Sequence, residues 1–213
     1  MNLKITLLLA MILEFWIPSL VMASEENSNF GNCRILDDCR LEFTHLSSQK
    51  TDPFLFSGRA MDSCHPRWHQ YRRAMRRFPD VRNCLTEAKQ DEVEPNLLLF
   101  DWQRVGTGRG AEVCVFRIAR SLRDLGQIKL WLEFHEFRVG NLSWRYSESY
   151  RPRYDTQPVS HITGYWTKER YRQVNSSWIA SLTGIDLILN YQLSVRFTQE
   201  NVVVGVHAET PSK

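Results

Sequence analysis

Residues 186–198, DLILNYQLSVRFT, are the clearest guide to the fold, because apolar and mostly polar side chains alternate along them. The turn QEN follows at 199–201, and Val202, Val204 and Val206 then repeat the alternation. Two alternating runs joined by a short turn are typical of an antiparallel hairpin with one buried face. This stretch therefore predicts a hairpin within an antiparallel sheet.

The residues before this hairpin predict further strands and one helix. The helix is expected over 122–134, where apolar residues recur at helical spacing and Ser121 can act as the N-cap. The strands are expected at 97–102, 113–119, 137–146 and 162–171. Together these elements predict an α+β fold, an antiparallel sheet with one helix packed on it.

The N-terminal half has helical rather than strand patterns. A helix is predicted over 66–78, beginning at Pro66 and stopping before Pro79, and a second short helix over 81–89. The apolar stripe of the first helix consists of Trp68, Tyr71, Met75 and Phe78. The rest of its surface carries Arg67, Arg72, Arg73, Arg76 and Arg77.

The composition changes near Glu94-Pro95, and this change divides the chain into three predicted parts. Residues 1–23 are predicted to be a signal peptide. Residues 24–95 are predicted to form a cysteine-containing helical segment, stapled by disulfides. Residues 96–213 are predicted to form the α+β domain.

The first 23 residues have the features of a secretory signal. Lys4 precedes an apolar run over 5–22, and Val21-Met22-Ala23 resembles a cleavage site before Ser24. Glu14 lies within the apolar run, and an acid at mid-membrane costs about 2.5–3.5 kcal/mol. We therefore expect a cleaved, secreted or periplasmic protein, with an uncleaved N-terminal anchor as the alternative.

All five cysteines follow the signal, so disulfides are expected in an oxidising compartment. Cys64 and Cys84 lie at opposite ends of the predicted 66–78 helix, too far apart to bond easily. The favoured scheme pairs each of them with Cys33 or Cys39. The sequential pairs Cys33–Cys39 and Cys64–Cys84 are the alternative, and Cys114 is expected to be a buried free thiol.

Two motifs suggest a cofactor or a metal only superficially. The run GTGRGA at 106–111 resembles a dinucleotide-binding fingerprint, but that fingerprint must lead into a helix and a strand is expected here. His65 and His69 have a metal-compatible spacing, but Pro66 separates them and no carboxylate completes the set. We therefore expect no cofactor and no metal.

Residues 144–154 have the composition most typical of a ligand-binding segment, because aromatic rings and guanidinium groups alternate there and can stack on sugars or hold anions. Strand packing alone could also explain several of the rings. The candidate ligand-binding residues are Trp144, Arg145, Tyr146, Tyr150, Arg151, Arg153 and Tyr154.

The absence of a catalytic motif and the Arg- and aromatic-rich segments favour a binding protein, and the charge balance does not point to nucleic acid. The net charge is +3, which is too mild to indicate nucleic acid, and most of the 27 basic residues are arginine. We expect an exported, non-enzymatic protein that binds an envelope component, an anionic ligand or a protein partner. The alternative is a hydrolase of an envelope polymer, with catalytic groups drawn from Glu133, His135, Glu136, Asp155 and His161.

Overall fold

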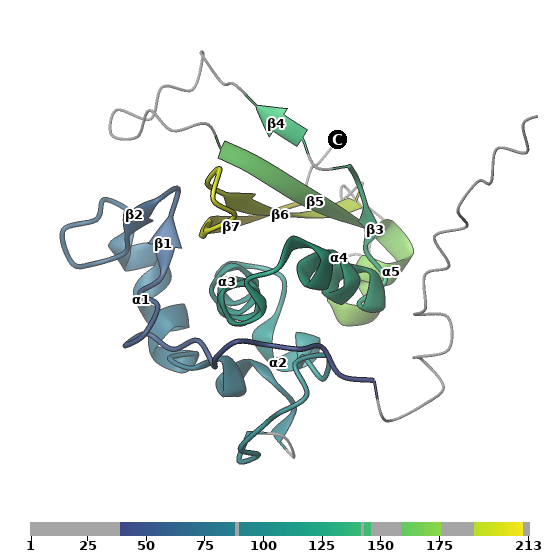
Figure 1. Cartoon of the computed structure of the whole chain (residues 1–213), viewed down its shortest axis with the longest axis horizontal. Helices are drawn as coiled ribbons and strands as arrows, with labels where there is room; N and C mark the ends of the chain where they lie inside the picture. Colours follow the sequence, from purple (N-terminus) through teal and green to yellow (C-terminus); the bar gives the residue numbers. More distant parts are fainter. Residues whose placement is uncertain (1–38, 88–89, 142, 146–158, 176–189, 211–213) are drawn as a thin grey trace, which may run out of the picture.

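The structure is a computed structural model, and it describes residues 39–87, 90–141, 143–145, 159–175 and 190–210. The described chain forms an antiparallel five-stranded sheet with helices against it, so the predicted α+β class is confirmed (Figure 1). The strand order is β3-β5-β6-β7, and β4 also pairs with β5.

The sheet is built around β5 (Val159–Thr167), β6 (Asn190–Phe197) and β7 (Val203–Glu209). The β6–β7 pairing confirms the predicted hairpin, and it places Leu193 and Val195 on the buried face. The short strands β3 (Arg138–Val139) and β4 (Ser143–Arg145) lie along the other edge of β5.

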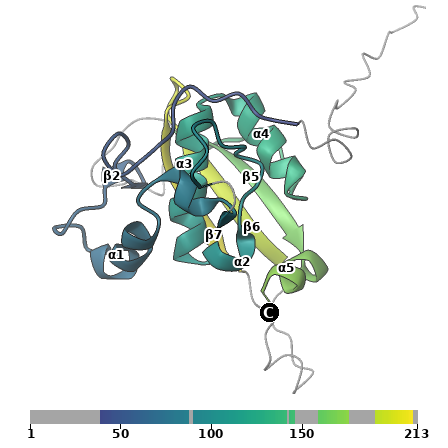
Figure 2. The same cartoon turned by 90° about the horizontal axis from the view of Figure 1, so that it is seen from below.

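Helix α3 (Arg109–Leu122) lies against one face of the sheet beside α4 (Leu125–Phe134), and it contacts β7 and α1 (Figures 1 and 2). It is almost entirely buried between 111 and 119, and it forms the centre of the core. The helix α1 (Trp68–Arg77) confirms the predicted 66–78 helix, with Tyr71 and Met75 buried.

The described chain also contains four short elements. A two-stranded hairpin, β1 (Leu55–Phe56) and β2 (Arg59–Ala60), precedes α1. A 3-10 turn, η2 (Val81–Cys84), occupies the start of the predicted 81–89 helix. Helix α2 (Trp102–Val105) precedes α3, and helix α5 (Lys168–Val174) follows β5 directly.

The strand predicted over 113–119 is wrong, because these residues lie within α3. Residues 111–119 are all buried, the charged Glu112 and Arg117 included, so this stretch lacks the contrast between a buried and an exposed face that marks a helix. The glycine run at 106–111 therefore leads into a helix, contrary to the expectation, and Gly108 is its N-cap. However, the run follows helix α2, whereas a dinucleotide fingerprint follows a strand.

Three smaller predictions also differ from the structure. Residues 97–102 make only an isolated bridge, Leu85 with Phe100, before α2 begins. The N-cap of α4 is Asp124, whose carboxylate accepts from the Gln127 N–H, because Ser121 is still inside α3. The strand expected over 162–171 ends at Thr167, which caps α5.

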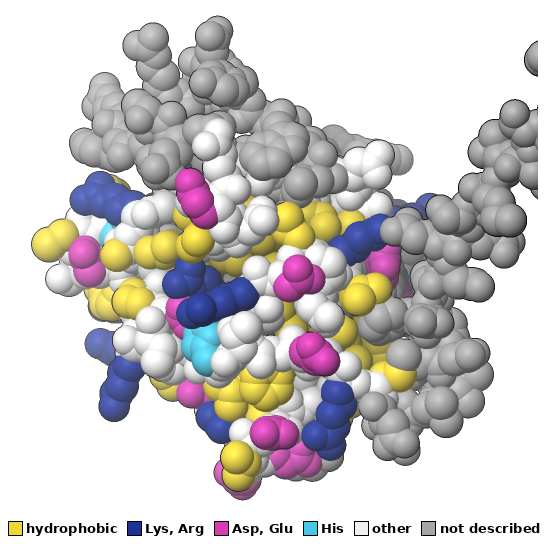
Figure 3. Space-filling model, viewed as in Figure 1, with side chains coloured by type: hydrophobic (Ala, Val, Ile, Leu, Met, Phe, Trp, Pro, Cys, Tyr) yellow, Lys and Arg dark blue, Asp and Glu magenta, His cyan; other side chains and the backbone are white. Residues whose placement is uncertain are grey.

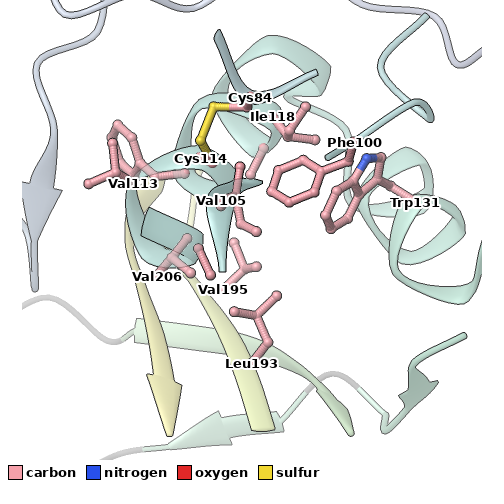
Figure 4. Close-up of a cluster of buried hydrophobic side chains, with 14 of the residues drawn as sticks. Cys84, Phe100, Val105, Val113, Cys114, Ile118, Trp131, Leu193, Val195 and Val206 are labelled. Atoms are coloured by element: carbon pink, nitrogen blue, oxygen red, sulfur yellow. A yellow bond between two sulfur atoms is a disulfide. The ribbon is translucent and has the colours of Figure 1, made fainter. Parts of the chain in front are cut away.

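The predicted disulfide scheme is wrong for Cys84, Cys114 and Cys64. Cys84 bonds to Cys114, and the disulfide lies inside the core beside Val105, Val113 and Ile118 (Figure 4). Cys64 is exposed and free, while Cys39 is disulfide-bonded. The error followed from the strand assignment, because the α3 helix turns Cys114 toward η2. The Cys84–Cys114 bond thus joins the segment before residue 95 to the one after it.

Candidate anion-binding site

The structure describes only part of the predicted ligand-binding segment. Trp144 and Arg145 lie on β4, where their backbones pair with Ser160 and Val159 of β5. The remaining five candidates, Tyr146, Tyr150, Arg151, Arg153 and Tyr154, lie outside the described residues. The segment therefore stays a prediction.

The residues of the hydrolase alternative do not meet around one cavity in the described part of the chain. His135 is buried among aromatic rings, and its Nδ1 accepts a hydrogen bond from the Trp102 indole at 3.1 Å. Burial, with a smaller effect of the Arg170 charge, lowers the pKa of His135 to about 3. Such an imidazole is a poor general base at neutral pH.

The other members of that set are spread over the molecule. Glu133 forms an i,i+4 ion pair with Lys129 on α4, and Glu136 pairs with Arg170 of α5. His161 lies on β5, and its side chain is half-buried. Asp155 lies outside the described residues.

Helix α1 exposes a set of arginines, as predicted. They are exposed, and Figure 3 shows basic side chains in dark blue at the edge of the molecule where α1 and the β1–β2 hairpin lie. Within the described ranges, no carboxylate pairs with any of the four on the helix body. These four are Arg72, Arg73, Arg76 and Arg77.

A second cluster, which sequence reasoning missed, surrounds the fully buried carboxylate of Glu112 on α3. Its Oε2 accepts from the Tyr71 hydroxyl and from Arg109 Nη1, both at 2.7 Å. Its Oε1 accepts from the Ala208 N–H at 3.0 Å and lies 3.2 Å from His207 Nδ1. A buried charge costs stability unless it is paired and hydrogen-bonded, and Glu112 meets both conditions.

These contacts set the protonation of the cluster. Burial alone raises the pKa of Glu112, but the hydrogen bonds from His207, Ala208 and Arg109 outweigh it and hold the pKa below its ordinary value. Burial, and then the Glu112 charge, raise the pKa of the Tyr71 hydroxyl. Glu112 is therefore ionised at neutral pH, and Tyr71 keeps its proton as the donor.

The β1–β2 hairpin docks on the outer edge of β7 next to this cluster. The Gly58 N–H donates to the Val204 carbonyl at 2.7 Å, and Ser57 has a positive φ of 51° in the turn. An uncovered edge strand presents unpaired N–H and C=O groups that invite pairing with another chain. Here the hairpin bonds to the Val204 carbonyl and Glu112 bonds to the Ala208 N–H, so part of the β7 edge already has hydrogen-bond partners.

A pocket of about 160 Å³ lies where the hairpin turn, the start of α1 and the strands β6 and β7 meet. Two arginines and one histidine contribute to its walls. Arg67 stacks over the Phe56 ring at 4.7 Å, and Arg196 Nη1 donates to Ser57 Oγ at 3.2 Å. The lining residues are Phe56, Ser57, Arg67, Arg196, Gly205, Val206 and His207.

Another ion network holds the N-terminal chain against α3. Asp52, which is almost fully buried, accepts from Arg120 at 2.7 Å and from His45 at 2.6 Å. Burial raises the pKa of Asp52, but its hydrogen bonds with His45 and Arg120 outweigh burial and lower it overall. Every partner comes from the protein itself, so this network serves to attach residues 45–52 to the helix.

The described residues hold no group of three or more metal-ligating side chains. His69 is exposed on α1, whereas His65 is buried and its Nδ1 accepts from the Arg67 N–H at 3.1 Å. The pair therefore does not converge on a shared ligand position. No helix in the described ranges is long and apolar enough to cross a membrane.

The fold and the cluster together define an α+β protein with a buried carboxylate network beside a basic pocket. The chain matches no protein-family model, and no curated protein and no solved structure shows significant similarity to it.

Proposed function

We propose that this protein is exported and binds an anionic polymer or anionic partner surface without catalysing a reaction. One observation carries the proposal: helix α1 exposes Arg72, Arg73, Arg76 and Arg77, and no carboxylate of the described chain pairs with them. Arginine presents five donors in a planar fork that suits carboxylate, phosphate and sulfate groups.

The spacing of these arginines strengthens the argument. Arg72 and Arg76 are separated by four residues, as are Arg73 and Arg77, and like charges at this spacing destabilise a helix by about 0.2–0.5 kcal/mol per pair. Helix α1 also has no acidic residue in its first turn. An anionic partner would relieve this repulsion on binding.

Export is supported by the disulfide chemistry. Cys84 and Cys114 form a disulfide, and disulfides persist mainly in secreted, periplasmic and extracellular proteins. The apolar N-terminal run, with Val21-Met22-Ala23 before Ser24, is the expected export signal. Residues 144–154 are proposed as a second contact for the same partner.

The test is retention on an anionic polysaccharide matrix over a salt gradient. The native protein should be retained and should elute as salt rises, because the Debye length falls from about 10 Å at 0.1 M to about 3 Å at 1 M. The triple variant Arg72, Arg73, Arg76→Gln should elute at clearly lower salt.

The matched control removes the same charge elsewhere. Lys50, Arg123 and Arg138 are exposed outside α1, and their triple change to Gln also lowers the net charge by three. This control should elute close to the native protein. Equal elution of the two triple variants would show that net charge, and not the α1 surface, governs retention, and the proposal would fail.

Hydrolysis is a second candidate, favoured by one contact. His207 lines the pocket that Ser57 also lines, and its Nδ1 lies 3.2 Å from the buried Glu112 carboxylate. A carboxylate that orients a histidine is the arrangement that general bases use. Hydrolysis of nitrophenyl acetate, phosphate or sulfate that is lost in a folded His207→Gln variant would support this candidate over pure binding.

A further inference from the structure

The walls of the pocket come from three separate parts of the chain. Arg67 precedes the first residue of α1, Arg196 lies on β6 and His207 lies on β7. In the sheet, Arg196 pairs with Gly205, and His207 is two residues further along β7 on the same face. The two strands therefore present Arg196 and His207 side by side toward the hairpin turn.

Each basic side chain is fixed at one point while other donors stay available. The Arg67 guanidinium rests on the Phe56 ring, and Arg196 uses one Nη1 donor on Ser57 Oγ. Within the described chain, no carboxylate forms an ion pair with either guanidinium. Since each guanidinium has five N–H donors, most of them can bind a ligand.

Glycine at position 205 keeps the pocket open between these groups. A Cβ at this position would lie 3.1 Å from the Ser57 backbone nitrogen and 3.6 Å from the Leu55 carbonyl oxygen. A side chain at residue 205 would therefore be in tight contact with the hairpin backbone, which would have to shift slightly away from β7. Because Gly205 is the cross-strand partner of Arg196, no side chain at position 205 separates Arg196 from the hairpin turn.

The buried network positions the third group. Glu112 holds His207 Nδ1 at 3.2 Å, and Glu112 is itself held by Tyr71, Arg109 and the Ala208 N–H. The imidazole Nε2 lies 3.7 Å from Glu209, a half-exposed carboxylate at the end of β7. Glu209 already places a negative charge beside His207. An anionic ligand must therefore compete with Glu209 for the imidazole.

We infer that this pocket is a binding site for one tetrahedral oxyanion, a phosphate or sulfate group. Its donors come from Arg67 just before α1, from β6 and from β7, and charge-assisted hydrogen bonds from several directions suit a tetrahedral group, whose oxygens also point in several directions. Its volume of about 160 Å³ fits such a group, and it is below the about 300–1,000 Å³ of sites for drug-sized ligands. The site is separate from the α1 surface of the proposed function.

The test is isothermal titration calorimetry of the full mature protein with inorganic phosphate, sulfate and acetate at constant ionic strength. Phosphate or sulfate should bind saturably, and acetate at least about tenfold more weakly. The single change Arg196→Gln should weaken the binding at least about tenfold, since it removes charge-assisted hydrogen bonds. Glu209→Gln should tighten it several-fold by removing the competing carboxylate.

The control is Arg138→Gln, which removes one exposed charge on β3, outside both the pocket and the α1 surface, and should leave the dissociation constant unchanged. If Arg196→Gln does not fold, the His207 ring signals of the native protein provide the second measurement, and they should shift saturably with phosphate or sulfate. Absence of saturable binding by the native protein, or equal binding by folded Arg196→Gln, would overturn the inference. Retention of the native protein on the anionic matrix would then still stand, so the two proposals fail separately.

Discussion

The Tyr71 hydroxyl on α1 donates a hydrogen bond to Glu112 Oε2 on α3 at 2.7 Å, across a separation of 41 residues. Arg109 also holds Tyr71 in place, because its Nη1 lies 2.8 Å from the same hydroxyl and its guanidinium stacks on the Tyr71 ring at 4.7 Å. The contact therefore fixes the arginine-bearing helix α1 to the centre of the core. It also connects α1, through Glu112, to His207 at the wall of the pocket.

Removal of this hydroxyl should destabilise the protein. Tyr71→Phe keeps the buried ring but leaves Glu112 with one donor fewer, and a hydrogen bond to a charged group contributes about 1.5–3 kcal/mol. Chemical denaturation should show a loss of that size in the free energy of unfolding. The matched change Tyr165→Phe, at an exposed position on β5, should leave this free energy unchanged. Equal stability of both variants would contradict the role assigned to the Tyr71–Glu112 contact.

The protein should lose stability as the pH falls, in part through His135 and, at lower pH, through Glu112. Burial lowers the folded-state pKa of His135 to about 3 from an ordinary 6.5, so the unfolded chain binds the extra proton between these values. Stability is therefore full above about pH 6.5 and falls by about 1.4 kcal/mol per pH unit below it. Glu112 also has a lowered folded-state pKa, and its contribution is lost at lower pH, below its ordinary 4.5.

The variant His135→Asn separates these two effects. An amide oxygen can still accept from the Trp102 indole, but it does not titrate, so the loss of stability between pH 6.5 and 4.5 should flatten. Denaturation midpoints measured across this range would show the change in slope. His69→Asn, an exposed change on α1, should retain the native slope. A native slope in His135→Asn would contradict the buried neutral state of His135.

The Cys84–Cys114 disulfide should contribute substantially to stability. It closes a loop with a sequence separation of 30, for which the chain-entropy model predicts about 4 kcal/mol. The double variant Cys84, Cys114→Ala should lose about this much in denaturant titrations, whereas Cys64→Ser should lose nothing, because Cys64 is exposed and free. Non-reducing peptide mapping that found Cys64 bonded to Cys84 would refute this connectivity.

The predicted segment 144–154 can be tested against the α1 surface. A triple variant Arg145, Arg151, Arg153→Ala should elute earlier from the anionic matrix and keep its melting temperature, if these residues contact the partner. Elution like that of the native protein would leave α1 as the whole contact surface. A lowered melting temperature would show that the segment packs instead of binding.

Export has its own direct measurement. N-terminal sequencing of the protein from its native host should begin at Ser24, as expected from Val21-Met22-Ala23. A chain that begins at Met1 and is recovered with membranes would favour the anchored alternative.

The elements predicted correctly are those with one buried and one exposed face. Apolar and polar residues alternate along the β6–β7 hairpin because one of its faces is less buried than the other. Helix α1 shows a clear apolar stripe because Arg72 and Arg73, on its other side, face solvent. Helix α3 has no such contrast over 111–119, since Phe116, Arg117 and their neighbours are all buried. One misassigned element then led to the wrong disulfide, because a strand would have placed Cys114 away from η2.

The basic pocket and the Glu112 cluster could not be found from sequence spacing. Glu112 and His207 are 95 residues apart, and only the packing of α3 against β7 brings them together. One signal was present: Glu112 and Arg117 interrupt an otherwise apolar run, and a charge in such a run must find a partner if it is buried. That signal indicates that a partner exists but not which residue it is.

Arg117 has a consequence for the order in which the molecule can assemble. Its fully buried guanidinium donates to the Phe78 and Asp52 carbonyls and to the Gln49 side chain, and burial lowers its pKa to about 10. All three acceptors lie upstream of α3. Whether the chain emerges from a ribosome or from an export channel, its N-terminal part comes first, so the acceptors are present when Arg117 arrives and its charge can be satisfied at once. A truncated chain that starts at residue 79 would lack all three acceptors. Its α3 could not pack into the core without burying the Arg117 guanidinium without these partners.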